Sequence, residues 1–111
     1  MTERIKLVQG DALPNVRLTL SDALSASAID LSDPDTVVRV YFRAQGDAQV
    51  LATITCEKLA GGATGEVRFN FAAGVLNIEP GAYEAEIEID FGGLTHTVYE
   101  PLKFSVRAQF A

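Results

Sequence analysis

The sequence of 111 residues contains one cysteine, one histidine, one methionine and no tryptophan. Cys56 is therefore unable to form a disulfide within the chain. Cys56 and His96 together provide only two of the four ligands that a structural zinc site needs. Basic residues are also scarce, since 9 lysine and arginine residues stand against 15 aspartate and glutamate residues. The resulting formal net charge of -6 disfavours nucleic acid and anionic membranes as partners.

Long uncharged segments are missing as well. The longest one covers residues 69–78, which is about half the length that a membrane-spanning helix needs. Charged residues near the start occupy the place where a signal peptide would be apolar, so we expect the chain to be made in the cytoplasm. A composition of 48% hydrophobic and 22% charged residues predicts a folded, soluble protein, and the length predicts one domain over residues 1–111.

What the sequence does contain is a regular series of strand and turn signals. Glycine, proline and aspartate recur about every ten residues, and alternating apolar residues lie between them, as is typical of a small all-β domain. Seven strands are predicted, over residues 4–9, 15–20, 36–44, 50–57, 66–71, 81–91 and 94–110. The irregular segment 21–35 separates the second and third strands, and residues 28–31 could add a short edge strand.

The clearest alternation lies in the sixth predicted strand, residues 81–91, where apolar residues are separated by acidic ones. One buried face and one solvated face are therefore predicted. The predicted buried residues are Tyr83, Ala85, Ile87, Ile89 and Phe91. The same reasoning turns Val16, Leu18, Leu20, Val38, Val40, Phe42, Val67, Phe69, Phe71, Phe104 and Val106 inward.

The seventh predicted strand follows a tight turn. Gly92-Gly93 predicts a two-residue hairpin, and this register places Val98 opposite Ile87 and Leu102 opposite Tyr83. Pro101 lacks a backbone donor, so it predicts that the last strand is interrupted and has an edge position or a bulge. The order of strands and a tyrosine after Pro80-Gly81-Ala82 predict an immunoglobulin-like antiparallel β-sandwich of about seven strands, with Tyr83 as a tyrosine corner.

Candidate chemical groups are few. The hairpin register turns His96 inward beside Ile89, where Cys56 could approach it and form a reactive thiolate–imidazole pair. The alternative is that Cys56 is a small buried apolar residue and that His96 is a hydrogen-bonded imidazole without a chemical role. Asp30, Asp33 and Asp35 lie close in sequence and could bind calcium, or they could cap their own turns. We expect no catalytic residue, no resident metal and no cofactor.

The acidic residues of the sixth predicted strand are the most informative group. Glu84, Glu86 and Glu88 have a spacing found in glycosidases, but a flat sheet face would not separate their pKa values. Arg39 and Arg43 are expected to pair with part of this stripe, while Lys103 would reach Glu84 only diagonally. The remaining acids are expected to bind a basic patch on a partner protein, or to serve only as a solubilising face. The predicted interface residues are Tyr41, Glu84, Glu86, Glu88, Tyr99 and Phe110.

Several segments resemble a known family. They are Gln9-Gly10-Asp11-Ala12-Leu13-Pro14, residues 16–22, Ala28-Ile29-Asp30-Leu31-Ser32-Asp33 and residues 37–43. In this order they resemble the immunoglobulin-like domain at the N-terminus of baseplate upper proteins of tailed bacteriophages. The later Glu79-Pro80-Gly81-Ala82-Tyr83 is similar to the PGxY segment of such modules.

This resemblance implies a non-enzymatic bacteriophage virion structural protein of the tail, baseplate, neck or particle-decorating kind. Its implied partners are other virion proteins and further copies of itself, and its implied location is the virion. Family members usually carry further domains, whereas this sequence ends at Ala111, so a free-standing adaptor or capsid-decorating piece is expected. The alternative is a stand-alone ligand- or carbohydrate-binding module. An enzyme is the third reading, and the sequence offers no site for it.

Overall fold

The computed structural model describes residues 4–12, 15–22 and 27–110, and almost all of its regular structure is strand. The elements are β1 (Arg4–Val8), β2 (Val16–Thr19), β3 (Val37–Ala44), β4 (Val50–Thr55), β5 (Glu57–Lys58), η1 (Ala60–Gly62), β6 (Glu66–Phe69), β7 (Gly81–Asp90), β8 (Thr95–Thr97) and β9 (Leu102–Arg107). The predicted all-β fold is confirmed. Leu13, Pro14 and residues 23–26, which belong to predicted turns and loops, lie outside the described residues.

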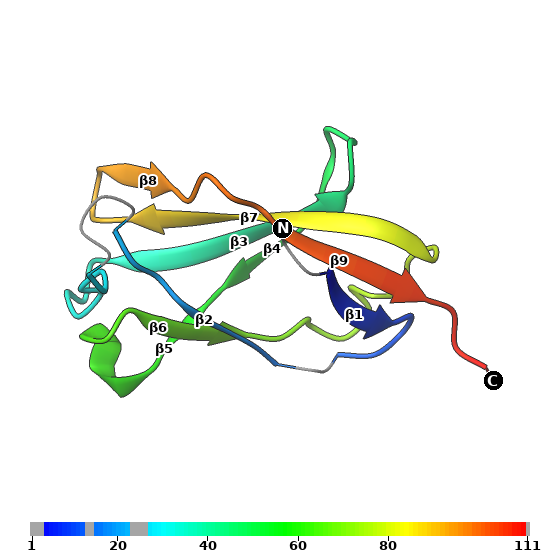
Figure 1. Ribbon diagram of the computed structural model, residues 1–111, viewed down its shortest axis with the longest axis horizontal. Coiled ribbons are helices and arrows are strands. Elements are labelled where there is room, and N and C mark those ends of the chain that lie inside the picture. Colours follow the sequence, from blue (N-terminus) through cyan, green and yellow to red (C-terminus); the bar gives the residue numbers. More distant parts are fainter. Residues whose placement is uncertain (1–3, 13–14, 23–26, 111) are drawn as a thin grey trace.

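The strands form two sheets that pack as the layers of a sandwich (Figure 1). The larger sheet, here called the main sheet, has the order β1-β9-β7-β3-β4, with β8 also paired to β7. The smaller sheet has the order β2-β6-β5. Among the described residues no helix is long and apolar enough to span a membrane.

Strand β7 lies at the centre of the main sheet, between β3 and β9. It pairs with β3 in an antiparallel register over the whole length of β3, from Val37 opposite Asp90 to Ala44 opposite Tyr83. The Gly92-Gly93 turn is also confirmed, because the Phe91 amide donates a hydrogen bond to the Leu94 carbonyl at 2.7 Å. The sixth predicted strand is thus held on both sides, and its two faces have fixed directions.

The core lies between the two sheets and is centred on aromatic rings. Phe42 of β3 has ring centroids of Phe71, Tyr83 and Phe104 at 5.1, 5.4 and 5.4 Å. Most of the residues predicted to face inward are buried: Val16, Leu20, Val38, Val40, Phe42, Val67, Phe69, Phe71, Tyr83, Ala85, Ile87, Ile89, Phe104 and Val106. Leu18 is partly buried against this core.

Two of the predicted strands are each divided in the structure, so the described residues contain nine strands. The predicted strand 50–57 separates at Cys56, where the chain leaves β3 and joins β6 of the smaller sheet as β5. The predicted strand 94–110 separates into β8 and β9 around Pro101, as the missing proline donor leads one to expect. Residues 28–31 form no strand, and only an isolated bridge joins Ser21 to Ala28.

The predicted edge position of the last strand is wrong. Strand β9 lies between β7 and β1, and β1 pairs with it in parallel, with Arg4 opposite Lys103 and Val8 opposite Arg107. The prediction of a purely antiparallel sandwich is also wrong, because the parallel pair of β1 and β9 makes the main sheet mixed. The backbone groups that a free edge would offer to another chain are therefore used by β1 within the molecule.

Two details of the hairpin register also differ from the prediction. Val98 donates to the Ile87 carbonyl as expected, but Leu102 lies opposite Ala85 and Phe104 lies opposite Tyr83. The segment between β8 and β9 leaves the ladder. When β9 pairs with β7 again, its register is shifted by two residues from the one that the Gly92-Gly93 turn predicts. Phe91 was predicted to be buried but is 40% exposed.

The turn after β5 packs closely on the loop before β3. The Leu31 amide donates to the Gly62 carbonyl, and the Leu20 amide donates to the Gly65 carbonyl, both at 2.8 Å. Gly62 and Gly65 have φ values of +89° and +74° and are buried. Backbone atoms of the facing segments occupy the space where a side chain would begin, so these two positions require glycine.

Candidate functional site

The acidic stripe predicted from the sequence lies on the outer face of the main sheet, which points away from the core. Its residues alternate with the buried ones along β7, and each faces a residue of β3. The facing pairs are Glu84 with Arg43, Glu86 with Tyr41, and Glu88 with Arg39. The expected lateral pairing of arginine with this stripe is therefore confirmed.

Glu84 is the most constrained acid of the stripe. Its carboxylate lies 2.7 Å from Arg43 Nη2 and 2.9 Å from Lys103 Nζ, and its side chain is only 11% exposed. The prediction that Lys103 reaches Glu84 only diagonally is wrong, because the shifted register of β9 places the two residues directly opposite each other. Hydrogen bonds from Lys103 and then Arg43 lower the pKa of Glu84 to about 2.

Replacing Glu84 with glutamine is expected to lower the free energy of unfolding by roughly 2–3 kcal/mol at pH 7. The folded state lowers this pKa, so the carboxylate stabilises the fold fully above pH 4.5, its ordinary value, and loses this effect as the pH falls toward 2. Urea unfolding between pH 7 and pH 2.5 measures the effect. The wild type should lose stability more steeply on acidification than Glu84→Gln.

Glu86→Gln is the matched control for this experiment, because Glu86 lies on the same strand, is exposed and makes no ion pair with any described residue. Its stability should stay within about 0.5 kcal/mol of the wild type. Equal losses in Glu84→Gln and Glu86→Gln would contradict the structural role of the Glu84 pairs.

Glu88 is also held by its neighbours. Arg39 Nη1 lies 3.7 Å from its carboxylate and 3.3 Å from that of Asp90. The Tyr41 hydroxyl donates to Glu88 at 2.9 Å, and this bond to the carboxylate is the main reason that the pKa of Tyr41 is raised. The Glu88 carboxylate is therefore already paired within the sheet.

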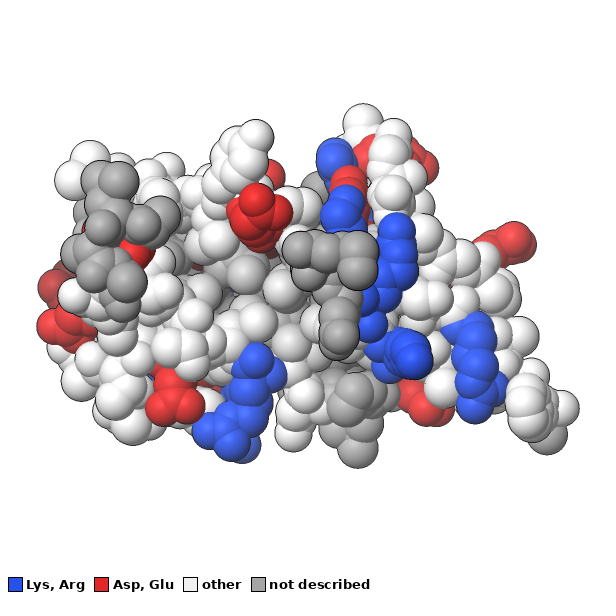
Figure 2. Space-filling view, viewed as in Figure 1, with Lys and Arg blue, Asp and Glu red and all other residues white. Residues whose placement is uncertain are grey.

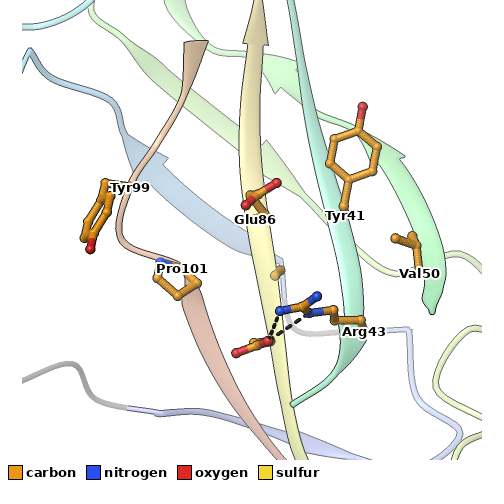
Figure 3. Close-up of a pocket in the computed structure, with 8 residues that line it drawn as sticks. Tyr41, Arg43, Val50, Glu86, Tyr99 and Pro101 are labelled. Atoms are coloured by element: carbon orange, nitrogen blue, oxygen red, sulfur yellow. Dashed lines mark hydrogen bonds and ion pairs between the residues drawn. The ribbon is translucent and has the colours of Figure 1, made fainter. Parts of the chain in front are cut away.

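Glu86 differs from its two neighbours. It lies between Tyr41 and the segment that carries Tyr99, and no hydrogen bond or ion pair joins it to another described residue (Figure 3). The register predicted from the Gly92-Gly93 turn would place Tyr99 opposite Glu86, but Tyr99 lies outside any strand and is 93% exposed. Glu86 is thus an acid with free acceptor groups between two tyrosines.

A hollow of about 380 Å³ opens beside Glu86. Tyr99 and Pro101 lie on one side of it, and Tyr41 and Val50 lie on the other (Figure 3). Arg43, Glu84, Ala85 and Glu86 complete the lining, and Arg43 and Glu84 are already paired with each other. A cationic or aromatic group would find a carboxylate and two tyrosine rings there.

A second hollow, of about 510 Å³, lies at the β8 end of the main sheet. Phe91 and His96 line it, together with Ser21, Asp22, Ile29, Thr97, Val98 and Tyr99. His96 lies opposite Ile89 as predicted but is exposed, because this hollow leaves it uncovered. Strand β8 pairs only with β7, so its side chains are less enclosed than those of β9.

The Cys56–His96 pair is not formed. Cys56 is bonded through its backbone to Val38 of β3, whereas His96 pairs with Ile89 of β7, so β3 and β7 both lie between the two side chains. Adjacent strands are about 4.8 Å apart, which places the pair far beyond hydrogen-bond distance. Burial raises the pKa of the Cys56 thiol to about 12, so it is protonated at neutral pH.

The aspartates before β3 cap their own turns. Asp30 accepts a hydrogen bond from the Ser32 amide, and Asp33 accepts one from the Asp35 amide, both at 2.9 Å. These are the turn contacts that aspartate makes without any metal. No group of three or more metal-binding side chains occurs within the described ranges.

Phe110 lies apart from the stripe, beyond the end of β9. It is 96% exposed, and the Arg107 guanidinium lies 4.8 Å from its ring centroid. Of the six predicted interface residues, Tyr41, Glu84, Glu86 and Tyr99 meet at one hollow, whereas Glu88 and Phe110 do not line it. No sequence pattern identifies Val50 and Pro101 as lining residues, because their positions depend on a hairpin and on the point where residues 98–101 leave the ladder.

Comparison with known proteins gives no further assignment. No protein-family model matches this sequence, and no curated protein is similar to it at a significant level.

Proposed function

We propose that this chain is a non-enzymatic structural protein of a bacteriophage virion, with an immunoglobulin-like sandwich that acts through protein–protein contacts. Its place would be in the tail, baseplate or neck, or on the particle surface as a decorating module. The main support for this proposal is the sequence resemblance to the N-terminal domain of baseplate upper proteins, in segments spread from Gln9 to Tyr83. Fold alone would carry no such assignment.

The arrangement of the strands supports the immunoglobulin-like part of this proposal. In sandwiches of the variable immunoglobulin type, extra strands extend the sheet of strands G, F and C beside strand C, and a sheet of strands A, B, E and D packs against it. Strand β4 would here be such an extra strand. The order β9-β7-β3-β4 over β2-β6-β5 is compatible with that plan. The Tyr83 hydroxyl also donates to the Glu79 carbonyl four residues earlier, as a tyrosine corner does.

The outer face of the main sheet supports the contact role. A binding face needs groups that the fold has not already satisfied, and Glu86 with Tyr99 beside the hollow provides them. Tyrosine supplies a large contact area with one polar end and is frequent in protein interfaces. Modules that occur in many copies on a particle gain affinity from repetition, so a small contact is sufficient.

The test is to purify phage particles from the native producer on a density gradient and to detect the chain by mass spectrometry and by antibody-labelled electron microscopy. We expect it to sediment with the particles and to label one defined site. The matched control is an abundant host protein of similar size, which should wash away. Recovery of the chain wholly in the soluble fraction would overturn the proposal.

A second candidate function is a stand-alone carbohydrate- or ligand-binding module. The observation in its favour is the hollow itself, since Tyr41 and Tyr99 lie on opposite sides of it and could stack on a sugar ring. This candidate requires the purified chain to bind glycans on an array and to stay outside the particle fraction. The same preparation therefore separates the two functions.

A further inference from the structure

The basic residues differ in whether they form an ion pair with a carboxylate. Of the 9 lysine and arginine residues, those paired with a carboxylate are Arg17, Arg39, Arg43, Arg68 and Lys103. Lys58 of β5 donates to the Asp33 carbonyl. The remaining three, Arg4, Lys6 and Arg107, form no ion pair with a described carboxylate, and all three belong to β1 or β9.

These three residues lie on one surface, here called the cationic stripe. The parallel register places Arg4 opposite Lys103, Lys6 opposite Ser105 and Val8 opposite Arg107, so alternate residues of both strands share a face. The intervening Leu7, Phe104 and Val106 are buried, which turns the stripe outward. Figure 2 shows basic side chains gathered in the half of the view where Figure 1 places β1 and β9.

No described carboxylate forms an ion pair with the cationic stripe. Arg4 donates to the Phe104 carbonyl and to the Gln45 side chain, and Arg107 lies over the Phe110 ring. Lys6 is exposed and has no hydrogen bond to a described residue. Three of the four basic residues that make no ion pair with a described carboxylate therefore lie at one place, and the fourth is Lys58 of β5 in the smaller sheet.

One acid without an ion pair lines the hollow, and a second lies in the adjoining segment of the chain. Glu86 projects from the outer face of β7, and Glu100 is exposed in the segment between β8 and β9 that also carries Tyr99. Neither makes an ion pair within the described part of the chain. One face of one sheet therefore carries a basic area over β1 and β9 and an acidic hollow over β7.

We propose that this face is an interface between two copies of the chain, in which the cationic stripe of each copy lies against the Glu86 hollow of the other. Both areas share a face, so a two-fold axis lying in the interface satisfies both contacts at once. Arginine and lysine fit a site with a carboxylate and two tyrosine rings. A second copy supplies these cations, whereas a nucleic acid would be repelled by the acidic remainder of the same face.

This inference deepens the proposed function, because a virion module present in repeated copies can use contacts between copies. The two are tested separately. Self-association is measured on the purified chain alone, and particle association is measured in lysates. A monomeric chain that still travels with particles would overturn only the inference.

The experiment uses two charge reversals at exposed positions, studied by sedimentation velocity at about 20 mM salt, where exposed charges are weakly screened. The variant Glu86→Lys with Glu100→Lys makes the hollow basic, and the variant Lys6→Glu with Arg107→Glu makes the stripe acidic. The wild type is expected to form dimers that dissociate as salt is raised. Each variant alone should self-associate at least roughly tenfold more weakly, because like charges then face each other.

Mixing the two variants is the decisive measurement. The basic hollow of one variant then faces the acidic stripe of the other, and the intact stripe faces the intact hollow, so mixed dimers should form. The matched controls reverse charges on the smaller sheet, as Glu57→Lys with Glu66→Lys and as Arg17→Glu with Arg68→Glu, and should behave as the wild type. A monomeric wild type, equal weakening in the controls, or variants that stay apart when mixed would each overturn the inference.

Discussion

Replacing Phe42 with alanine is expected to lower the free energy of unfolding by about 3–5 kcal/mol. Phe42 is fully buried at the centre of the ring cluster, where it contacts Phe71, Tyr83 and Phe104. The substitution removes apolar contacts with both sheets at once, because Phe71 follows β6 while Tyr83 and Phe104 belong to the main sheet. The surrounding rings are held by backbone pairing on β7 and β9, so the cavity is expected to collapse only in part.

Urea unfolding followed by far-ultraviolet circular dichroism measures this loss. Phe110→Ala is the matched control, since the same side chain is removed from a position that is 96% exposed. The control should change the free energy of unfolding by less than about 0.5 kcal/mol. A loss at Phe42 as small as that at Phe110 would show that the rings do not form the centre of the core.

Replacing Gly65 with alanine is expected to cost about 2–5 kcal/mol of stability. A Cβ atom at this position would lie 2.5 Å from the Leu20 carbonyl oxygen, which is backbone and has little freedom to move. The φ value of +74° adds the strain of a left-handed conformation, about 1–2 kcal/mol for an ordinary residue. The rest of the expected loss of stability arises because the added Cβ forces the Gly65 turn away from the loop at Leu20.

Gly61→Ala separates the two causes. Gly61 has a similar φ of +70°, but no atom of another segment lies within 4 Å of the position where its Cβ would be. It should therefore lose only the conformational part, about 1–2 kcal/mol. If Gly61→Ala and Gly65→Ala unfold at the same urea concentration, the close approach of the Gly65 turn to Leu20 has no energetic effect.

The parts of the fold that the sequence predicts well are those set by neighbouring residues. The alternation in residues 81–91 predicts the faces of β7 because side chains of a strand point to opposite sides in turn. Gly92-Gly93 predicts the hairpin register as far as Val98, because the turn fixes the pairing of the residues next to it. Burial of Phe91 is predicted wrongly, since alternation gives a direction but does not show whether the other sheet extends far enough to cover it.

The long-range pairing is what local patterns do not contain. Alternation in residues 4–8 predicts a strand but does not identify β9 as its partner or the parallel direction of the pair. The short contact between Glu84 and Lys103 depends on a shift of two residues around Pro101, which the turn rules do not determine. The candidate site follows the same division, because Tyr41 and Glu86 are predicted from strand faces, while the hollow depends on how residues 98–101 leave the ladder.

The pairing of β1 with β9 also determines when the chain is able to complete its fold during synthesis. Lys103, the partner of Arg4, is translated 99 residues after it. Until then Leu7, which is buried in the finished sheet, has no strand beside it and stays accessible to other nascent chains. The main sheet therefore closes only after β9 has been made, and closing so long a loop costs conformational entropy that slows this last step.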